Sequence, residues 1–168
     1  MEMIIGIATG TPVWVWVVFA YGIYTGIKAL GERRVSLKTM ILLPGVFLFL
    51  SVPSLVGIVG QNPLVALVWG LCLLAGLVLG WYLLTPEPVS VDRTAGTLVV
   101  PGTWTVLVLF VTIFTVKFVY GFEQAVNPEL AAQPGFLLGV FALSGLSTGI
   151  VIGRTAKNYY EFSQAAMV

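Results

Sequence analysis

The chain has 168 residues, 58% of them hydrophobic and 9% charged, and its formal net charge is +1. Soluble domains carry about 25% charged and about 45–50% apolar residues, so this composition excludes an ordinary soluble domain and predicts a membrane protein. The basic residues are few and scattered, so we expect no nucleic-acid partner. Because no linker-like stretch divides the sequence, we predict a single transmembrane domain over residues 1–168, surrounded by the lipid bilayer.

Five apolar runs are long enough to cross a hydrocarbon core of about 30 Å as α-helices. Their approximate ranges are 12–30, 39–60, 64–84, 103–123 and 136–154. Proline follows a capping residue at Thr11-Pro12 and at Asn62-Pro63, which is typical of the first residues of a helix. The predicted fold class is therefore all-α: a polytopic membrane helix bundle of five transmembrane helices.

The positions of the charged residues predict the orientation of this bundle, because short loops rich in Lys and Arg stay on the cytoplasmic side. Basic residues follow the first, third and fifth spans, whereas the charged residues on the alternate side are all acidic. The basic group is Lys28, Arg33, Arg34, Lys38, Arg93, Arg154 and Lys157, and the acidic group is Glu2, Glu123 and Glu129. We therefore expect an N-terminus outside, a C-terminus in the cytoplasm and a multi-pass location in the plasma (inner) membrane.

The longest predicted cytoplasmic segment lies between spans three and four, at 85-TPEPVSVDRTAGTLVVPGTW-104. Residues 89–91 and 97–100 favour β-structure, and Gly96 ends the polar stretch between them. This pattern predicts a small cytoplasmic β-hairpin, which we interpret as a cap over that end of the bundle. On the opposite side, 122-FEQAVNPELAAQPG-135 predicts an acidic outer loop with room for a short interfacial turn.

The residue types most useful in catalysis and metal binding are scarce. The chain has no histidine and one cysteine, Cys72, in the middle of the third span. Histidine-ligated haem or zinc and nucleophiles activated by histidine are therefore excluded, as is any intramolecular disulfide. No nucleotide-binding motif follows a predicted strand. We expect no metal site and no cofactor, and we assign no catalytic residue.

Small residues recur at intervals of four in three predicted spans. Such stripes let helix backbones approach closely, which is a main route to helix association in lipid. The residues are Gly22 and Gly26 in the first span, Gly76 and Gly80 in the third, and Gly145, Gly149 and Gly153 in the fifth. We favour helix packing within one chain, and the alternative is the seam of a homo-oligomer.

The second predicted span contains two prolines, Pro44 and Pro53. Pro53 leaves a backbone carbonyl near Phe49 without its donor, and Ser51 and Ser54 flank this position. The kink predicts either a polar cavity or, as we favour, a distortion that the two serine hydroxyls satisfy.

One lysine, Lys117, lies inside the apolar run 110-FVTIFTVKFVYGFEQ-124. At 1.5 Å per residue it is about 9 Å below the outer end of its span. A lysine at the centre of a span costs about 2.5–3.5 kcal/mol on insertion scales and less near its edge, and the long side chain can reach toward the interface. Helical side chains lean toward the N-terminus of their helix, which here is the cytoplasmic direction. Lys117 would therefore have to leave its preferred rotamers to reach the outer interface.

If Lys117 instead points inward, it needs a polar partner, and no other predicted span contains a carboxylate. The candidate ligand-binding residues around it are Tyr120, Gln124, Tyr21, Tyr24, Ser51 and Ser54, with Glu123 and Glu129 on the outer loop as further partners. The hypothesis is an outward-facing polar pocket in which Lys117 binds an anionic or carbonyl-bearing small molecule or a lipid headgroup. The alternatives are a lysine that reaches the interface and a purely structural pair.

The overall layout resembles small uncharacterised bacterial inner-membrane protein families of about five spans, which are grouped as domains of unknown function. The resemblance lies in the basic segment 32-ERRVSLK-38, the predicted hairpin 91-VDRTAGTLVVPG-102 and the aromatic span 114-FTVKFVYG-121. It covers most of the chain and implies no established activity, so no functional residue is carried over.

Three classes of function are consistent with these features. A small-molecule or lipid binding or transport protein is favoured by the kinked span, the glycine-rich helices and Lys117. A structural or accessory subunit would account for the scarce chemistry, and it predicts a larger membrane partner. A membrane enzyme is the least favoured class, because Lys117, Tyr120 and Asp92 are the only candidate acid or base groups and Asp92 lies on the opposite side of the membrane.

Overall fold

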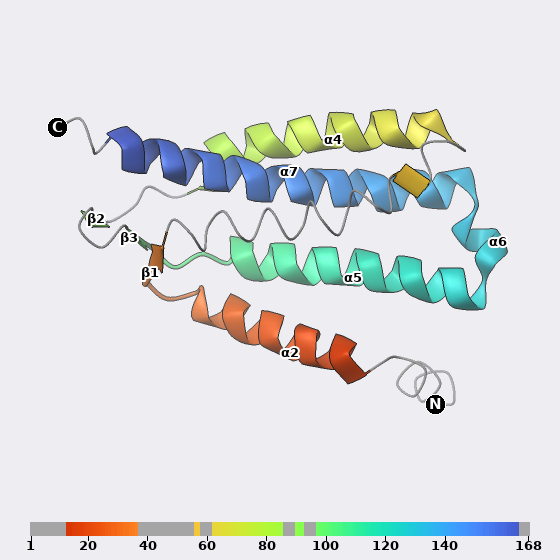
Figure 1. Ribbon diagram of the computed structural model, residues 1–168, viewed down its shortest axis with the longest axis horizontal. Helices are drawn as coiled ribbons and strands as arrows, with labels where there is room; N and C mark the ends of the chain where they lie inside the picture. The colour runs from red at the N-terminus through yellow and green to blue at the C-terminus, as the bar shows by residue number, and fades with distance from the viewer. Residues whose placement is uncertain (1–12, 37–55, 58–61, 86–89, 93–96, 165–168) are drawn as a thin grey trace.

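The structure is a computed structural model that describes residues 13–36, 56–57, 62–85, 90–92 and 97–164 (Figure 1). The long helices lie side by side, with a small sheet at one end and a short helix at the other. In chain order the elements are α2 (Val13–Lys28), β1 (Arg33–Ser36), α4 (Pro63–Tyr82), β2 (Ser90–Asp92), β3 (Thr97–Val100), α5 (Thr105–Val126), α6 (Pro128–Ala131) and α7 (Pro134–Gln164).

Three of these helices, α4, α5 and α7, are long and apolar enough to cross a membrane. They correspond to the third, fourth and fifth predicted spans. The helix α2 corresponds to the first predicted span, and its 16 described residues begin directly after residues 1–12, which lie outside the described part of the chain. The second predicted span, 39–60, lies outside the described residues except for positions 56–57.

The last helix corrects one predicted boundary. The fifth span was expected to end at residue 154, but α7 continues to Gln164 and has 31 residues. Hydropathy detects only the part of a helix that suits lipid, and the polar end of α7 is stabilised by other contacts. Lys157 forms an i,i+4 ion pair with Glu161 at 3.7 Å and also donates a hydrogen bond to the Thr85 carbonyl at 3.1 Å.

The glycines of α4 and α7 set how these two helices pack. A Cβ added at Gly145, Gly149 or Gly153 would collide with the backbone carbonyl oxygens of residues 69, 73 and 77 of α4, respectively. The numbers rise together along both helices, so α4 and α7 run parallel. Gly76 and Gly80 approach the α7 backbone in the same way. These stripes therefore bring two backbones into contact within one chain.

The helix α2 packs against α5 in the opposite sense. The ring of Phe110 lies over Gly22, and Leu107 lies over Gly26, so the numbering falls along α5 as it rises along α2. The two helices are antiparallel, and Phe19 adds ring contacts to Phe110 and Phe114 with centroid distances of 6.4 and 4.6 Å. The result is an aromatic cluster between α2 and α5.

The three strands form one antiparallel sheet in the order β1-β3-β2. The predicted hairpin is present as β2 and β3, which pair Ser90 with Val99 and Asp92 with Thr97. The basic segment 32–38 was interpreted as a loop, and this was wrong for Arg33–Ser36, which forms β1 and pairs with β3. A strand of four residues with two arginines has little β-propensity of its own. It forms because it pairs with a strand about 60 residues away, which a local pattern does not predict.

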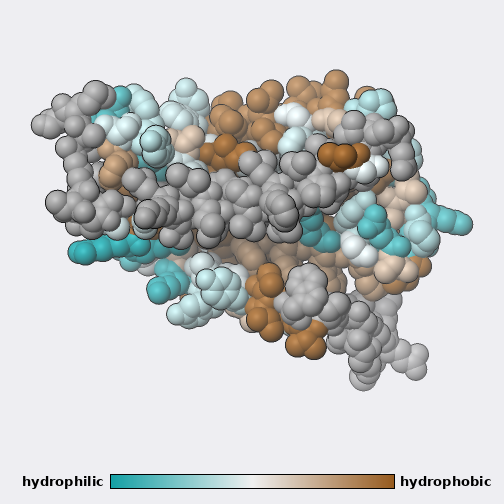
Figure 2. All heavy atoms as spheres, in the orientation of Figure 1, coloured by the Kyte–Doolittle hydropathy of each residue, from teal (hydrophilic) through white to brown (hydrophobic). Residues whose placement is uncertain are grey.

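The surface of the helices is apolar over much of its area, as Figure 2 shows for one face. Hydrophobic side chains gather over α4 at the top of that view, whereas hydrophilic ones gather at the two ends. On α4 the exposed residues follow a helical spacing of three and four: Leu64, Leu67, Leu71, Leu74 and Val78. An apolar surface of this extent is expected where lipid, not water, surrounds the protein.

Candidate functional site

Lys117 lies on α5 between the side that faces α2 and the side that faces α7. At 100° per residue it projects close to Phe110 and Phe114, which meet α2, and is also within about 60° of Tyr120, whose ring meets Phe141 of α7 edge-on at 5.9 Å. Its side chain is half-buried. Within the described part of the chain, Lys117 forms no hydrogen bond and no ion pair.

Two of the predicted partners share this strip of α5. Gln124 donates a hydrogen bond from Nε2 to the Tyr120 hydroxyl oxygen at 2.9 Å. The Tyr120 hydroxyl lies one turn and the Gln124 amide two turns beyond Lys117, on the same side of the helix. The three side chains therefore form a polar strip near the α6 end of α5.

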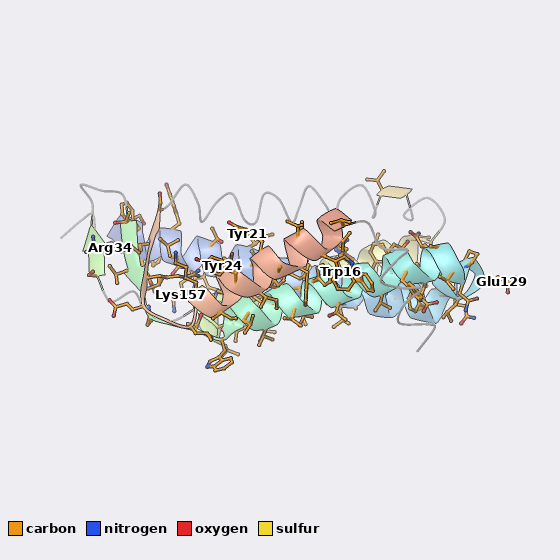
Figure 3. All side chains as sticks on the ribbon, turned by 90° about the horizontal axis from the view of Figure 1, so that it is seen from below. Trp16, Tyr21, Tyr24, Arg34, Glu129 and Lys157 are labelled. Atoms are coloured by element: carbon orange, nitrogen blue, oxygen red, sulfur yellow. The ribbon has the colours of Figure 1, made fainter. Side chains whose placement is uncertain are left out.

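The structure does not bring the remaining described candidates to this strip. Tyr21 and Tyr24 are 70% and 63% exposed and point away from the side of α2 that carries Gly22 and Gly26 (Figure 3). Glu129 lies at the tip of the molecule and is exposed. Ser51 and Ser54 lie outside the described residues.

A second polar group of residues, which sequence analysis did not single out as a site, lies at the sheet end of the bundle. Arg154 of α7 donates a hydrogen bond from Nη2 to Thr103 Oγ1 at 3.3 Å. Thr103 in turn donates its backbone N–H to the Ala29 carbonyl oxygen at 2.9 Å, which joins the end of α2 to the start of α5. Arg154 thus links three helices at one point.

Arg33 lies close to Arg154, and the two positive charges repel each other. The strand register explains this position. Arg33 is paired with Val100 and shares a sheet face with Leu98 and Val100, which are 0% and 7% exposed, so Arg33 points toward the helices. Burial lowers the pKa of the Arg33 guanidinium from its usual value, because desolvation disfavours the charged form.

The next residue in the strand, Arg34, points to the opposite face and is exposed (Figure 3). From sequence, both arginines were interpreted only as markers of the cytoplasmic side. The alternation of a β-strand would have separated them, but β1 itself was not predicted.

Chemistry beyond binding has little support in the described residues. Among them, no three His, Cys, Asp or Glu side chains come together as metal ligands. Cys72 is a free thiol on α4. What the structure offers is two groups of cationic and hydroxyl side chains at opposite ends of an apolar helix bundle.

The chain is mainly helical, has three helices suited to crossing a membrane, and exposes an apolar surface. It is therefore of the class of helical proteins that associate with lipid bilayers. Residues 1–164 match the model of a family described as "Family of unknown function (DUF6622)". The match covers nearly the whole chain, so the chain belongs to this family. Comparison with curated proteins found no match, and neither did comparison with solved structures.

Proposed function

We propose that the protein is a five-span, multi-pass protein of the plasma (inner) membrane, with its N-terminus outside, that binds or transports an anionic small molecule or lipid at Lys117. The observation that carries the binding proposal is a half-buried lysine without a hydrogen bond or ion pair in the described part of the chain. Intramembrane ionisable residues usually mark a ligand path or a polar partner.

The directions of the helices support the five crossings. The helix α5 is antiparallel to α2 by the pairs around Gly22 and Gly26, and antiparallel to α7 because the Thr103 hydroxyl meets Arg154 whereas Tyr120 meets Phe141. Since α4 is parallel to α7, the three helices α2, α4 and α7 share one direction. The chain leaves β1 at the sheet end and starts α4 at the other end, which is the change of side that the predicted second span requires.

The orientation can be tested with two single cysteines in a Cys72→Ala background. Arg34 and Glu129 are both exposed and lie at opposite ends of the molecule (Figure 3). In intact cells, a membrane-impermeant maleimide should label Glu129→Cys directly and Arg34→Cys only after permeabilisation. Labelling of both residues from the same side would refute the proposed orientation.

The binding site can be tested by its access to water. In the same background, Lys117→Cys should react with a charged methanethiosulfonate reagent in reconstituted vesicles. The control is Val119→Cys on the same helix, where the side chain is 38% exposed. In the proposed topology this side chain faces lipid, so the reagent should not reach it. Equal protection of both cysteines would mean that no water-connected pocket reaches position 117.

A binding measurement completes the test. Sodium acetate, sodium phosphate and phosphatidylglycerol vesicles serve as anionic probes, and the unfolding temperature of the full chain reports binding. At least one probe should stabilise the wild-type protein more than the Lys117→Met variant. Equal shifts for both proteins with all three probes would contradict the proposal and favour a structural role for Lys117.

A further inference from the structure

Two guanidinium groups lie at the sheet end of the bundle, near enough for their charges to interact. Arg154 comes from α7 and Arg33 from the edge strand β1, and their charges repel. Buried cations are expected to be paired, because moving a charge out of water without a partner costs several kcal/mol of free energy. The carboxylate of Glu161, on the same stretch of α7, is ion-paired with Lys157 at 3.7 Å.

The two terminal nitrogens of Arg154 differ in their hydrogen bonding. Nη2 donates to Thr103 Oγ1, whereas Nη1 is buried and, among the described residues, has no hydrogen-bond partner. A guanidinium has five donors in a planar fork, and the geometry of that fork matches the oxygens of a phosphate group. Arg33 is only half-buried and lies on the edge of the sheet, so, as far as the described residues show, the pair is approachable from the β1 side.

Exposed aromatic side chains lie at this end of the bundle. Among them are Tyr82 at the last residue of α4, Trp104 before the first residue of α5, and Tyr159 on α7. Exposed Trp and Tyr side chains are enriched at membrane–water interfaces. Trp104 directly follows Thr103, the hydrogen-bond partner of Arg154.

From these observations, we infer that Arg33 and Arg154, with the Thr103 hydroxyl beside them, hold a phosphate group at the sheet end of the bundle. The phosphate belongs to an anionic phospholipid headgroup or to a soluble phosphate compound. The bound anion separates two like charges and supplies acceptors to the unpaired nitrogen of Arg154. Arg34 takes no part, because strand alternation turns it to the outer face.

The test uses the full-length protein in nanodiscs of phosphatidylcholine with and without phosphatidylglycerol, followed by native mass spectrometry of retained lipid. Arg154→Gln and Arg33→Gln should each reduce retained phosphatidylglycerol on the order of tenfold, as expected for the loss of a charge-assisted pair. Arg34→Gln is the matched control and should retain wild-type levels. Equal loss in Arg34→Gln would mean only diffuse attraction to a negative surface and would overturn the inference.

A second measurement covers the case in which a glutamine variant does not fold. The unfolding temperature of the wild-type protein should rise with phosphatidylglycerol if the phosphate is a headgroup, or with inorganic phosphate in phosphatidylcholine nanodiscs if it is soluble. No rise with either probe would overturn the inference.

Discussion

Replacing Gly149 with alanine tests whether close backbone contact holds α4 and α7 together. A Cβ at this position would collide with the carbonyl oxygen of Leu73 and lie 2.9 Å from the nitrogen of Leu77. Both atoms belong to the backbone of α4, so relief requires the two helices to separate. Overpacking of this kind costs about 1–3 kcal/mol.

The control is Gly139→Ala on the same helix, where an added Cβ meets no atom within 4 Å. Glycine to alanine inside a helix is favourable by roughly 0.5–1 kcal/mol, and this gain applies to both variants. The difference between the two variants therefore isolates the collision, and Gly149→Ala should be less stable than Gly139→Ala by about 1–3 kcal/mol.

The assay is thermal unfolding of both purified variants in the same detergent, followed by the helical circular dichroism signal. Gly139→Ala should unfold at or above the wild-type temperature and Gly149→Ala below it. If Gly149→Ala were as stable as Gly139→Ala, the α4 and α7 backbones could not be in the close contact described, and the packing argument would be refuted.

Two further comparisons test the sheet and the contact between α2 and α5 in the same assay. Leu98 is fully buried in the central strand, so Leu98→Ala should cost about 2–5 kcal/mol, and Val99→Ala on the opposite face should cost much less; equal losses would contradict the assigned strand faces. At Gly22 the obstacle is the ring of Phe110. Moving the ring off its preferred rotamer costs about 0.5–1.5 kcal/mol, which is close to the stability that alanine adds to a helix in place of glycine. Gly22→Ala should therefore leave the stability of the protein nearly unchanged. A large loss of stability would mean that the ring is fixed.

Much of the helical framework was predictable because hydropathy and helix-start signals are local. Proline at position 63 begins α4 as expected, and the third and fourth spans agree with α4 and α5 within a few residues. The end of α7 was missed because residues after 154 are polar, and their helix is stabilised by the pair Lys157 and Glu161 and by the contact of Lys157 with Thr85. A search for apolar runs detects the membrane-suited segment and not the helix that contains it.

The candidate site residues also divide into those that local sequence predicts and those that depend on helix packing. Lys117 was recognisable from sequence because a charge inside an apolar run is conspicuous, and its neighbours Tyr120 and Gln124 follow from helical spacing. Tyr21 and Tyr24 were included as polar side chains of the first span, yet the rotation of α2 about its axis depends on Gly22 and Gly26 meeting α5. That rotation is a property of the interface between helices.

The amino-acid sequence by itself determined that this chain suits lipid, which of its segments are apolar helices and where its cations lie, because these follow from composition and local periodicity. Only the tertiary structure decided that α4 and α7 pack in parallel through their glycines, and that Arg33 pairs into a sheet and turns toward Arg154 while Arg34 faces outward. Those arrangements join residues far apart in the chain, and their geometry depends on the register between elements, which no local pattern encodes.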